Sequence, residues 1–402
     1  MVDALHRGSN QSGLRAYNER LLLSLLREHG ALPKTDLARR TGLSAQTISV
    51  IARELEGEGL LQRGSPTRGK VGQPSVPLSL APEGAAFFGL QVGRRGADLV
   101  LIDFLGKLLA RRHITYPYPM PEGLIRFVRE GVRSLLADQP RLIEKRVAGL
   151  GIALPGQLWE WADKIGAPRA RMDAWRTADI RALLAEELPF PVYLQNDASS
   201  ACGAELVFGD SRGLHDFLYF YIDYFVGGGV VLGGSLYTGR HGNAGAVGSM
   251  PVPGPRGRFT QLIDRASLST LAERLDPAQA LLLWEGHESW DIDARVLSAW
   301  LRESSRALAH AITAAISVIE FDAILIDGWL PRAVRSELVR KTRESLQECD
   351  LSGLEEPRLM EGTVGAQARA LGAAALPLTR RFLVDRHGPG DNWPQPSESA
   401  AA

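Results

Sequence analysis

The sequence predicts an α/β protein that begins with a winged helix-turn-helix domain, and three observations lead to this fold class. Apolar residues recur every three to four positions in the first sixty residues, which is the period of amphipathic helices. Beyond residue 85, short apolar runs alternate with helical stretches, as in α/β domains. The segment "APEG" at 81–84 separates the two patterns. A chain of 402 residues is also long enough for two or three domains.

The first helix is predicted from Asn10 to about Gly30. The apolar stripe that we expect to face the core consists of Leu14, Tyr17, Leu21, Leu22, Leu25 and Leu26. A second, short helix is expected to begin at Pro33, because the missing N–H of proline is harmless at the first helical position. This helix is expected to end near Thr41.

The segment "TGLSAQTISVIARELEGEGLL" at 41–61 has the pattern of a turn followed by a recognition helix. Gly42 permits a tight turn, and Ser44 is a good N-cap. The residues spaced to face inward are Ile48, Ile51 and Leu55. An ordinary helical hairpin shares this pattern, but residues 60–80 then read as strand, basic Gly/Pro-rich tip and strand, which is the shape of a wing. Residues 10–80 are therefore predicted to bind DNA.

The start of the recognition helix is where side chains reach base edges in such domains, and glutamine suits adenine. Arginine and lysine farther along the helix and in the wing suit phosphates. The residues expected to face DNA are Ser44, Gln46, Thr47, Ser49, Arg53, Arg68 and Lys70. Residues 1–80 carry 11 Lys and Arg against 7 Asp and Glu, while the whole chain is neutral, so the positive excess lies at this end.

Cysteine usage and hydropathy predict a cytoplasmic protein. Cys202 and Cys349 stand far apart and form no C-x-x-C pair, so neither a disulfide framework nor a cysteine-rich zinc site is expected. The N-terminal segment is polar where a signal peptide needs an apolar core. No apolar run approaches the roughly 18 residues of a membrane span, so we expect no contact with a membrane.

The body is predicted to be a sheet protein with intervening helices. Strands are expected in "FFGLQVG", "ADLVLIDFLGKLL", "VAGLGIAL", "VYLQND", "FLYFYID" and "GGVVLGGSLY", and helices at 121–138, 177–187 and about 292–319. A strand hairpin with a glycine turn occurs at both 87–104 and 217–234, which suggests an internal duplication. The tail at 385–402 is rich in Pro, Ser and Gly, and we expect it to be disordered.

The parts, taken in order, resemble the ROK-family transcriptional regulators, in which a winged helix-turn-helix is joined to a body related to sugar kinases. The resembling pieces are "TGLSAQTISVIARELEGEGLLQRG", "GQPSVPL", "GLGIALPG", "PVYLQNDASSACGAELVFG", "LYFYIDYFVGGGVVLGGSLYTGRHGNAGAVG" and "GAQARALGAAAL". The resemblance implies a two-lobed actin-like ATPase (ribonuclease H-like) body and a homodimer or homotetramer. It divides the body into a first lobe at 85–198, joined by a C-terminal helix at 363–382, and a second lobe at 199–362.

Three departures from the family's kinases predict that the body is not an enzyme. Where the kinases have D-x-G-G-T for magnesium and phosphate, this chain has "QVGRRG", in which Gln91 replaces the aspartate. Where they have G-T-G, it has Asp223, Tyr224 and Phe225, a carboxylate and two bulky rings. The turn "IDGWL" places Trp329 where a glycine is expected. No catalytic residue, nucleotide or other cofactor is therefore expected.

The sugar-binding side of the resemblance is partly retained. Asn196 and Asp197 match the family's sugar-contacting pair, and Pro155 and Gly156 match a turn beside the same pocket. An ionised carboxylate accepts hydrogen bonds from sugar hydroxyls without any nucleotide. A structural Asx turn at the end of a strand is the alternative interpretation of Asn196 and Asp197. Arg169 stands where the kinases have a sugar-contacting asparagine, and a surface arginine is the alternative there.

Other family residues are missing. Ala246 and Ser249 replace the glutamate and histidine of the family's G-E-x-G-H motif, and the cysteine-rich zinc loop is absent, so no metal is expected. We therefore expect a DNA-binding regulator, more often a repressor in such families, that responds to a sugar or sugar derivative and binds an operator in double-stranded DNA. The alternatives are an active sugar kinase with an attached DNA-binding domain, and a regulator whose body binds a protein partner.

Overall fold

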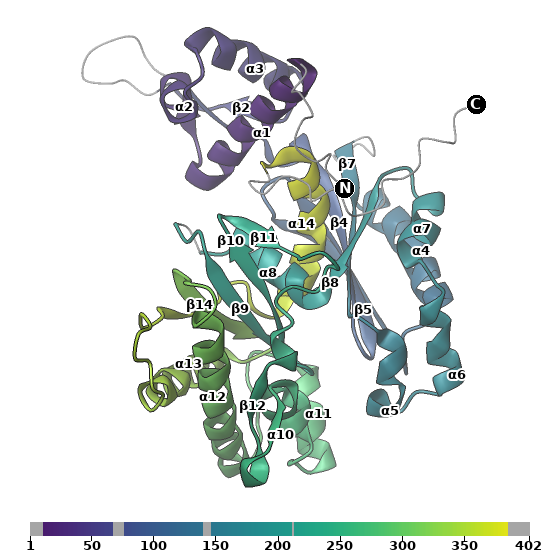
Figure 1. Cartoon of the computed structure of the whole chain (residues 1–402). Helices are drawn as coiled ribbons and strands as arrows, with labels where there is room; N and C mark the ends of the chain where they lie inside the picture. The colour runs from purple at the N-terminus through teal and green to yellow at the C-terminus, as the bar shows by residue number, and fades with distance from the viewer. Residues whose placement is uncertain (1–10, 67–75, 140–145, 211–212, 385–402) are drawn as a thin grey trace, which may run out of the picture.

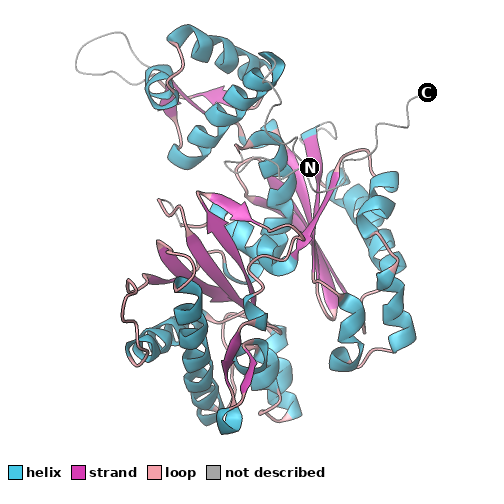
Figure 2. Ribbon diagram, viewed as in Figure 1, coloured by secondary structure: helices cyan, strands magenta, loops and turns pink. Residues whose placement is uncertain are grey.

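The computed structural model describes residues 11–66, 76–139, 146–210 and 213–384 (Figure 1). Arg68 and Lys70, and the tail expected to be disordered, lie outside the described residues. Figure 2 shows the α/β fold class that the sequence predicts: a small, mainly helical domain above a body built around two five-stranded sheets. The predicted fold class is confirmed.

The N-terminal domain is a winged helix-turn-helix. Its elements are α1 (Gln11–His29), β1 (Leu32–Pro33), α2 (Lys34–Thr41), α3 (Ala45–Gly57), β2 (Leu61–Arg63) and β3 (Pro77–Leu80). Gly42 adopts a φ of 71°, a left-handed conformation that glycine takes without strain, and so ends α2 before the turn. The strands form one sheet in the order β1-β3-β2. Pro33 belongs to β1 and α2 begins at Lys34, one residue later than predicted, because Pro33 pairs with Pro77 in this sheet.

The predicted apolar stripe of α1 is wrong in its N-terminal half. Leu14 and Tyr17 are 54% and 50% exposed, whereas Leu22, Leu23 and Leu26 are buried. Leu23 was not expected in the stripe. The C-terminal half of α1 packs within its own domain and also meets the C-terminal helix of the body, so it buries a wider face than one apolar stripe.

The first lobe holds a five-stranded sheet in the order β6-β5-β4-β7-β8. Its strands are β4 (Ala86–Val92), β5 (Gly96–Asp103), β6 (Leu108–Thr115), β7 (Val147–Leu154) and β8 (Val192–Asn196). The helices α4 (Pro121–Ala137) and α7 (Ile180–Glu187) contact each other and contribute to the same apolar core. Two short helices, α5 (Ala162–Ile165) and α6 (Arg169–Met172), lie between β7 and α7 along the chain, flanked by 3-10 turns at Leu158–Trp161 and Asp173–Arg176.

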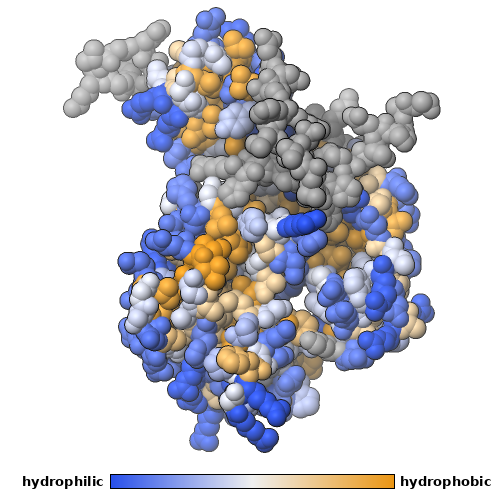
Figure 3. Space-filling view, in the orientation of Figure 1, coloured by the Kyte–Doolittle hydropathy of each residue, from blue (hydrophilic) through white to orange (hydrophobic). Residues whose placement is uncertain are grey.

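The second lobe repeats the strand order of the first. Its strands are β9 (Phe217–Ile222), β10 (Gly227–Leu232), β11 (Ser235–Tyr237), β14 (Ala323–Gly328) and β15 (Leu359–Glu361), in the order β11-β10-β9-β14-β15. Each sheet thus consists of an antiparallel three-strand meander followed by two parallel strands, which supports the predicted duplication. Figure 3 shows apolar side chains gathered over β10 and β11, and the molecule hollowed between the two lobes.

The helices of the second lobe are α8 (Asp197–Phe208), α9 (Ile263–Ala266), α10 (Leu268–Ala272), α11 (Pro277–Glu285), α12 (Ala294–Ile316) and α13 (Arg332–Gln347). Strands β12 (Pro251–Pro253) and β13 (Phe259–Gln261) form a separate hairpin between β11 and α9. The C-terminal helix α14 (Ala368–Phe382) returns to the centre of the molecule and packs on α8, β4 and β7 (Figure 1).

Candidate ligand site and DNA-binding surface

Some of the predicted DNA-facing residues of the recognition helix α3 are exposed, and others form the N-cap of the helix. Ser44 is the N-cap: its Oγ accepts a hydrogen bond from Thr47 N at 3.1 Å and lies 2.8 Å from Thr47 Oγ1. Ser44 and Thr47 therefore satisfy each other. Gln46 and Arg53 are exposed, and Ser49 is half-buried. Gln46 and Arg53 are the two whose side chains project freely from the helix.

Val50 on the same helix is a candidate that sequence reasoning missed. It is 46% exposed, although its neighbours Ile48 and Ile51 are buried. Gln46, Val50 and Arg53 are four and three residues apart and so share one helix face. A single valine in an apolar helix is normally assigned to the core. The signal was its spacing, because Val50 falls between the positions that face inward.

Strand pairing assembles the predicted ligand site at one edge of the first sheet. The strands β4, β7 and β8 are parallel, so their carboxyl ends meet, and Leu154 pairs with Asn196. The turn at Pro155 and Gly156 therefore lies beside Asn196. A Cβ built on Gly156 would be 4.0 Å from Asn196 Nδ2. Four of the predicted ligand-binding residues, Pro155, Gly156, Asn196 and Asp197, are thus brought together.

Asn196 also has a structural role, as the N-cap of helix α8. Its Oδ1 accepts hydrogen bonds from Ala198 N at 3.1 Å and Ser199 N at 3.2 Å, which caps helix α8. The Asx-turn interpretation is therefore correct for this oxygen. The Nδ2 group points to the Gly156 turn and is the part of Asn196 that remains directed at the site.

Asp197, the first residue of α8, is held by an arginine from the far end of the sequence. Its Oδ2 lies 3.4 Å from Arg369 Nη1, and Arg369 Nη2 pairs with Asp223 Oδ2. The Asp197 side chain is 17% exposed. Burial raises the pKa of Asp197 above its ordinary value; the Arg369 charge opposes this rise, and the Asp223 charge adds to it.

Arg369 is the residue of this site that the sequence did not indicate. It is the second residue of α14, and its guanidinium carbon lies 5.6 Å from the centre of the Tyr221 ring. Burial lowers the pKa of Arg369, but Asp223, Tyr221 and Asp197 together raise it above the ordinary arginine value. One guanidinium thereby joins the end of β9, the start of α8 and the start of α14.

Arg169 does not join the other four predicted residues. It is exposed at the start of α6, which packs on the neighbouring short turns. Figure 1 places α6 at the outer end of the first lobe, far from β8 and α8 at the centre of the molecule. The placement agrees with the alternative interpretation of Arg169 as a surface arginine.

The two altered phosphate loops contact each other across the lobes. The guanidinium carbon of Arg94 lies 3.7 Å from the centre of the Tyr224 ring and 5.3 Å from that of Trp284. Phe225 meets Trp161 of the first lobe edge to face, with 5.2 Å between ring centres. Burial lowers the pKa of Arg94. Side chains of both lobes therefore occupy the space between these two loops.

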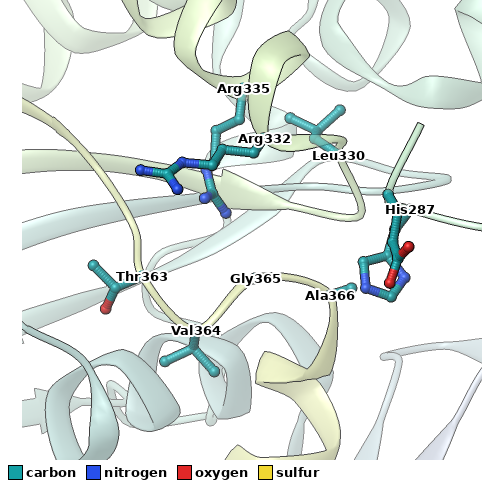
Figure 4. A pocket seen from close by; sticks show the side chains of 9 residues that line it. His287, Leu330, Arg332, Arg335, Thr363, Val364, Gly365 and Ala366 are labelled. Carbon is teal, nitrogen blue, oxygen red and sulfur yellow. The ribbon is translucent and has the colours of Figure 1, made fainter. Parts of the chain in front are cut away.

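Trp329, the third departure, fixes the wall of a cavity in the second lobe. Its Nε1 donates to Leu283 O at 2.9 Å, and its ring lies 4.8 Å from that of His287. The cavity has a volume of about 360 Å³ (Figure 4), and it is lined by His287, Glu288, Leu330, Arg332, Arg335 and residues 363–366. Arg335 is already paired with Asp327 at 2.8 Å and Glu361 at 3.1 Å.

A second cavity of about 640 Å³ opens on the first lobe, lined by Arg95, Ile165, Gly166 and residues 115–118. Asp197 lines neither of these two cavities. In the described part of the chain, His, Cys, Asp and Glu form no group of three that could hold a metal ion. None of the described helices is both long and apolar enough to cross a membrane.

A winged helix-turn-helix on a two-lobed, duplicated α/β body defines a class of protein: a DNA-binding regulator built on a sugar-kinase fold. Residues 87–275 match the model of the ROK family, and residues 17–68 match that of the MarR family of helix-turn-helix proteins. The chain therefore carries a MarR-type helix-turn-helix domain in front of a ROK family domain.

Curated relatives are distant. "Uncharacterized protein y4fQ" of Sinorhizobium fredii is 26% identical over 91% of this chain and 92% of its own length. The xylose repressor of Bacillus spizizenii is 24% identical over 61% of this chain and 62% of the relative. NagC, a DNA-binding transcriptional dual regulator of Escherichia coli, is 23% identical over 69% of this chain and 68% of the relative. The matched region thus covers almost the whole length of the first relative and about two thirds of the length of each of the other two.

Solved structures share the fold. A ROK family transcriptional regulator, a homologue of the Escherichia coli MLC protein, matches 92% of this chain and 96% of its own with a TM-score of 0.68 at 21% identity. A ROK family glucokinase from Streptomyces griseus, solved with glucose and AMPPNP, matches 73% of this chain and 99% of its own with a TM-score of 0.53 at 22% identity.

Proposed function

We propose that this protein is a transcriptional repressor that binds an operator through α3 and the wing, and releases it when a sugar or sugar derivative binds between the lobes. The observation that carries the proposal is Asp197 at the start of α8, beside Gly156 at the sheet edge, in a body whose phosphate loops are filled by Arg94 and Tyr224. Relatives named as repressors support it. It acts in the cytoplasm as a homodimer or homotetramer.

Asp197 supplies the recognition chemistry. An ionised carboxylate accepts hydrogen bonds from two neighbouring hydroxyls, and such charge-assisted bonds are stronger than neutral ones. Asn196 Nδ2 donates to a third polar atom of the ligand. Ala246 and Ser249 supply neither a carboxylate nor an imidazole, so the ligand makes fewer hydrogen bonds than a hexose makes in the family's kinases. Relatives named xylose repressor and N-acetylglucosamine repressor make these two sugars the first compounds to test.

Catalytic inactivity is the second part of the proposal. A kinase needs an anchored magnesium ion and room for the transferred phosphate. Gln91 is a neutral side chain, 8% exposed, at the end of β4. Arg94 stacks on Tyr224 where phosphate would pass. The body is therefore a sensor that kept the sugar side of a kinase and lost the nucleotide side.

We expect no sugar-dependent ATP hydrolysis, because the chain offers neither the magnesium anchor nor the phosphate space. The assay measures ADP release with ATP, magnesium and D-xylose, D-glucose or N-acetylglucosamine, against a reaction without protein. Asp197→Asn is the matched variant, since it removes the carboxylate that would accept the sugar hydroxyl proton. ADP release above background that disappears in Asp197→Asn would show an active kinase and overturn this part of the proposal.

Val50 is expected to read a thymine methyl group in the operator. Its exposed side chain stands between two polar residues on α3, and apolar side chains contact the thymine methyl in the major groove. Burying one methyl group is worth about 0.8 kcal/mol, or roughly fourfold in affinity. After an operator is selected from random duplexes, each thymine is replaced by uracil. Uracil at one position should weaken binding of the parent and leave Val50→Ala unchanged; equal losses in both proteins would refute the assignment.

A further inference from the structure

We propose that Arg369 is a positioning residue that links the state of Asp197 to the position of the winged helix-turn-helix, through the paired helices α8 and α14. This inference rests on the proposed function, in which Asp197 binds the ligand. Both helices begin at the ligand site. At the other end, α14 reaches the DNA-binding domain (Figure 1), and Phe208 at the end of α8 lies under Arg27 of α1. A displacement of Arg369 at one end of the helix pair is therefore transmitted to the other end.

At the ligand site, one guanidinium holds both helices. Arg369 contacts Asp197, which starts α8, and Asp223, which follows β9 in the second lobe. A sugar whose hydroxyls bond to Asp197 competes for the same carboxylate oxygens. Ligand binding thus loosens one of the two ion pairs that fix the start of α14, while the pair with Asp223 ties Arg369 to the second lobe.

Between their ends, the two helices are packed backbone to backbone. A Cβ built on Gly372 of α14 would overlap Ser200 O of α8. A Cβ on Gly151 of β7 would overlap Ala373 O, and one on Gly89 of β4 would overlap Ala370 O. Because no side chain lies between these backbones, there is no flexible group to absorb a shift, and α14 moves together with α8 and with the strands β4 and β7 on which it packs. The 15 residues of α14 span about 22 Å.

At the far end, both helices contact the DNA-binding domain or the residues on which it rests. Phe382 near the end of α14 packs against Phe104 and Phe87, with ring centres 5.0 and 5.8 Å apart. Val384 N donates to Ser24 Oγ of α1 at 3.0 Å. Phe208, the last residue of α8, lies under the guanidinium of Arg27 of α1, 5.7 Å from ring centre to carbon.

Arg27 of α1 strengthens the contact between the DNA-binding domain and the body. It also donates to Phe104 O, and its burial lowers its pKa to about 10. The apolar core is continuous across the boundary: Leu22, Leu23 and Leu26 of α1 belong to the same buried cluster as Leu378 and Phe382 of α14. A displacement of α14 is therefore transmitted to α1, which is the scaffold on which α3 is presented.

Hydrogen exchange of the full chain, without any sugar, tests this link. In Arg369→Gln we expect the amides of α1 between residues 20 and 29 to exchange at least fivefold faster than in the parent, while those of α12, at the opposite end of the second lobe, keep their rates. Arg369→Lys keeps the charge and should restore most of the α1 protection. Arg274→Gln is the matched control, because Arg274 pairs with Glu303 at 2.8 Å in the second lobe, away from α14.

Unchanged exchange in α1 of a folded Arg369→Gln protein would overturn the inference, as would equal acceleration in α1 and α12, which indicates general destabilisation. Should Arg369→Gln not fold, the charge-balanced Arg369→Gln/Asp223→Asn protein takes its place with the same criteria. The experiment contains no ligand, so a negative result here is separate from a failure of Asp197 to bind sugar, which the affinity of Asp197→Ala reports.

Discussion

Replacing Gln46, Val50 and Arg53 together by alanine is expected to weaken operator binding roughly 10²- to 10⁴-fold. The three residues share the exposed face of α3. Losing the Gln46 base contact costs about 1–3 kcal/mol, losing the Val50 methyl contact about 0.8 kcal/mol, and losing a charged hydrogen bond from Arg53 to phosphate about 1.5 kcal/mol. Together they account for about 3–5 kcal/mol. The fold should persist, because all three side chains project from the domain core and alanine is a good helix former.

Fluorescence anisotropy with a labelled operator duplex measures this effect. The matched control replaces Glu122, Arg126 and Arg133 by alanine; these residues are exposed on α4 of the first lobe. The control protein should bind the operator as the parent does. Retained affinity in the α3 variant, or an equal loss in the α4 variant, would mean that DNA is read by another surface.

The winged helix-turn-helix is better tested by point variants than by truncation. Its apolar core is shared with the body: Leu78 and Leu80 of β3 belong to the same buried cluster as Phe87 and Phe104. A fragment that begins at residue 81 would expose this surface to water and lose stability for reasons unrelated to DNA. The three-residue variant leaves the shared core intact.

Asp197→Ala is expected to weaken sugar binding roughly 10- to 100-fold. The variant removes a charge-assisted acceptor whose loss typically costs about 1.5–3 kcal/mol. Arg369 keeps its pair with Asp223, so the start of α14 stays attached to the second lobe. Isothermal titration with D-xylose, D-glucose and N-acetylglucosamine gives the affinities. Asp173→Ala is the control, because Asp173 pairs with Arg176 on the surface of the first lobe. Equal sugar affinity in parent and Asp197→Ala would remove Asp197 from the ligand site.

The raised pKa of Asp197 adds a pH dependence with a definite sign. The protonated carboxyl loses acceptor capacity, and burial moves the pKa upward from the ordinary aspartate value. Sugar affinity of the parent should therefore rise as the pH increases through this raised pKa, and the rise should be absent in Asp197→Ala. In the protein without ligand, the same shift favours the protonated form, so the contribution of Asp197 to stability is largest at low pH and is lost as the pH rises.

Much of the architecture could be predicted because it depends on residues that are close together in the sequence. Ser44 caps α3 as expected, and the strand ending in Asn196 is followed at once by α8. The turn at Gly156 could be placed beside Asn196 only through the resemblance, because the pairing of β7 with β8 is not a local property.

The missed features depend on contacts between distant segments. Arg369 is 172 residues from Asp197 in the sequence, so no spacing rule indicates their pairing. The short strand β1 forms only because Pro33 meets Pro77. Leu23 is buried because the domain rests on the body, which periodicity within one helix does not reveal. Arg169 was placed at the site from the family's motif, whereas the structure sets it on the exposed start of α6, apart from Asn196 and Asp197.

The most direct test of the central claim is release of the operator by a sugar. The full chain is bound to a labelled, selected operator, and D-xylose, D-glucose and N-acetylglucosamine are titrated in turn, with parent, Asp197→Ala and Asp173→Ala proteins side by side. The account predicts that at least one of these sugars weakens DNA binding of the parent and of Asp173→Ala tenfold or more, and that Asp197→Ala stays bound at the same concentrations. No release of the parent by any of the three sugars, or release of Asp197→Ala at the same concentration as the parent, would contradict it.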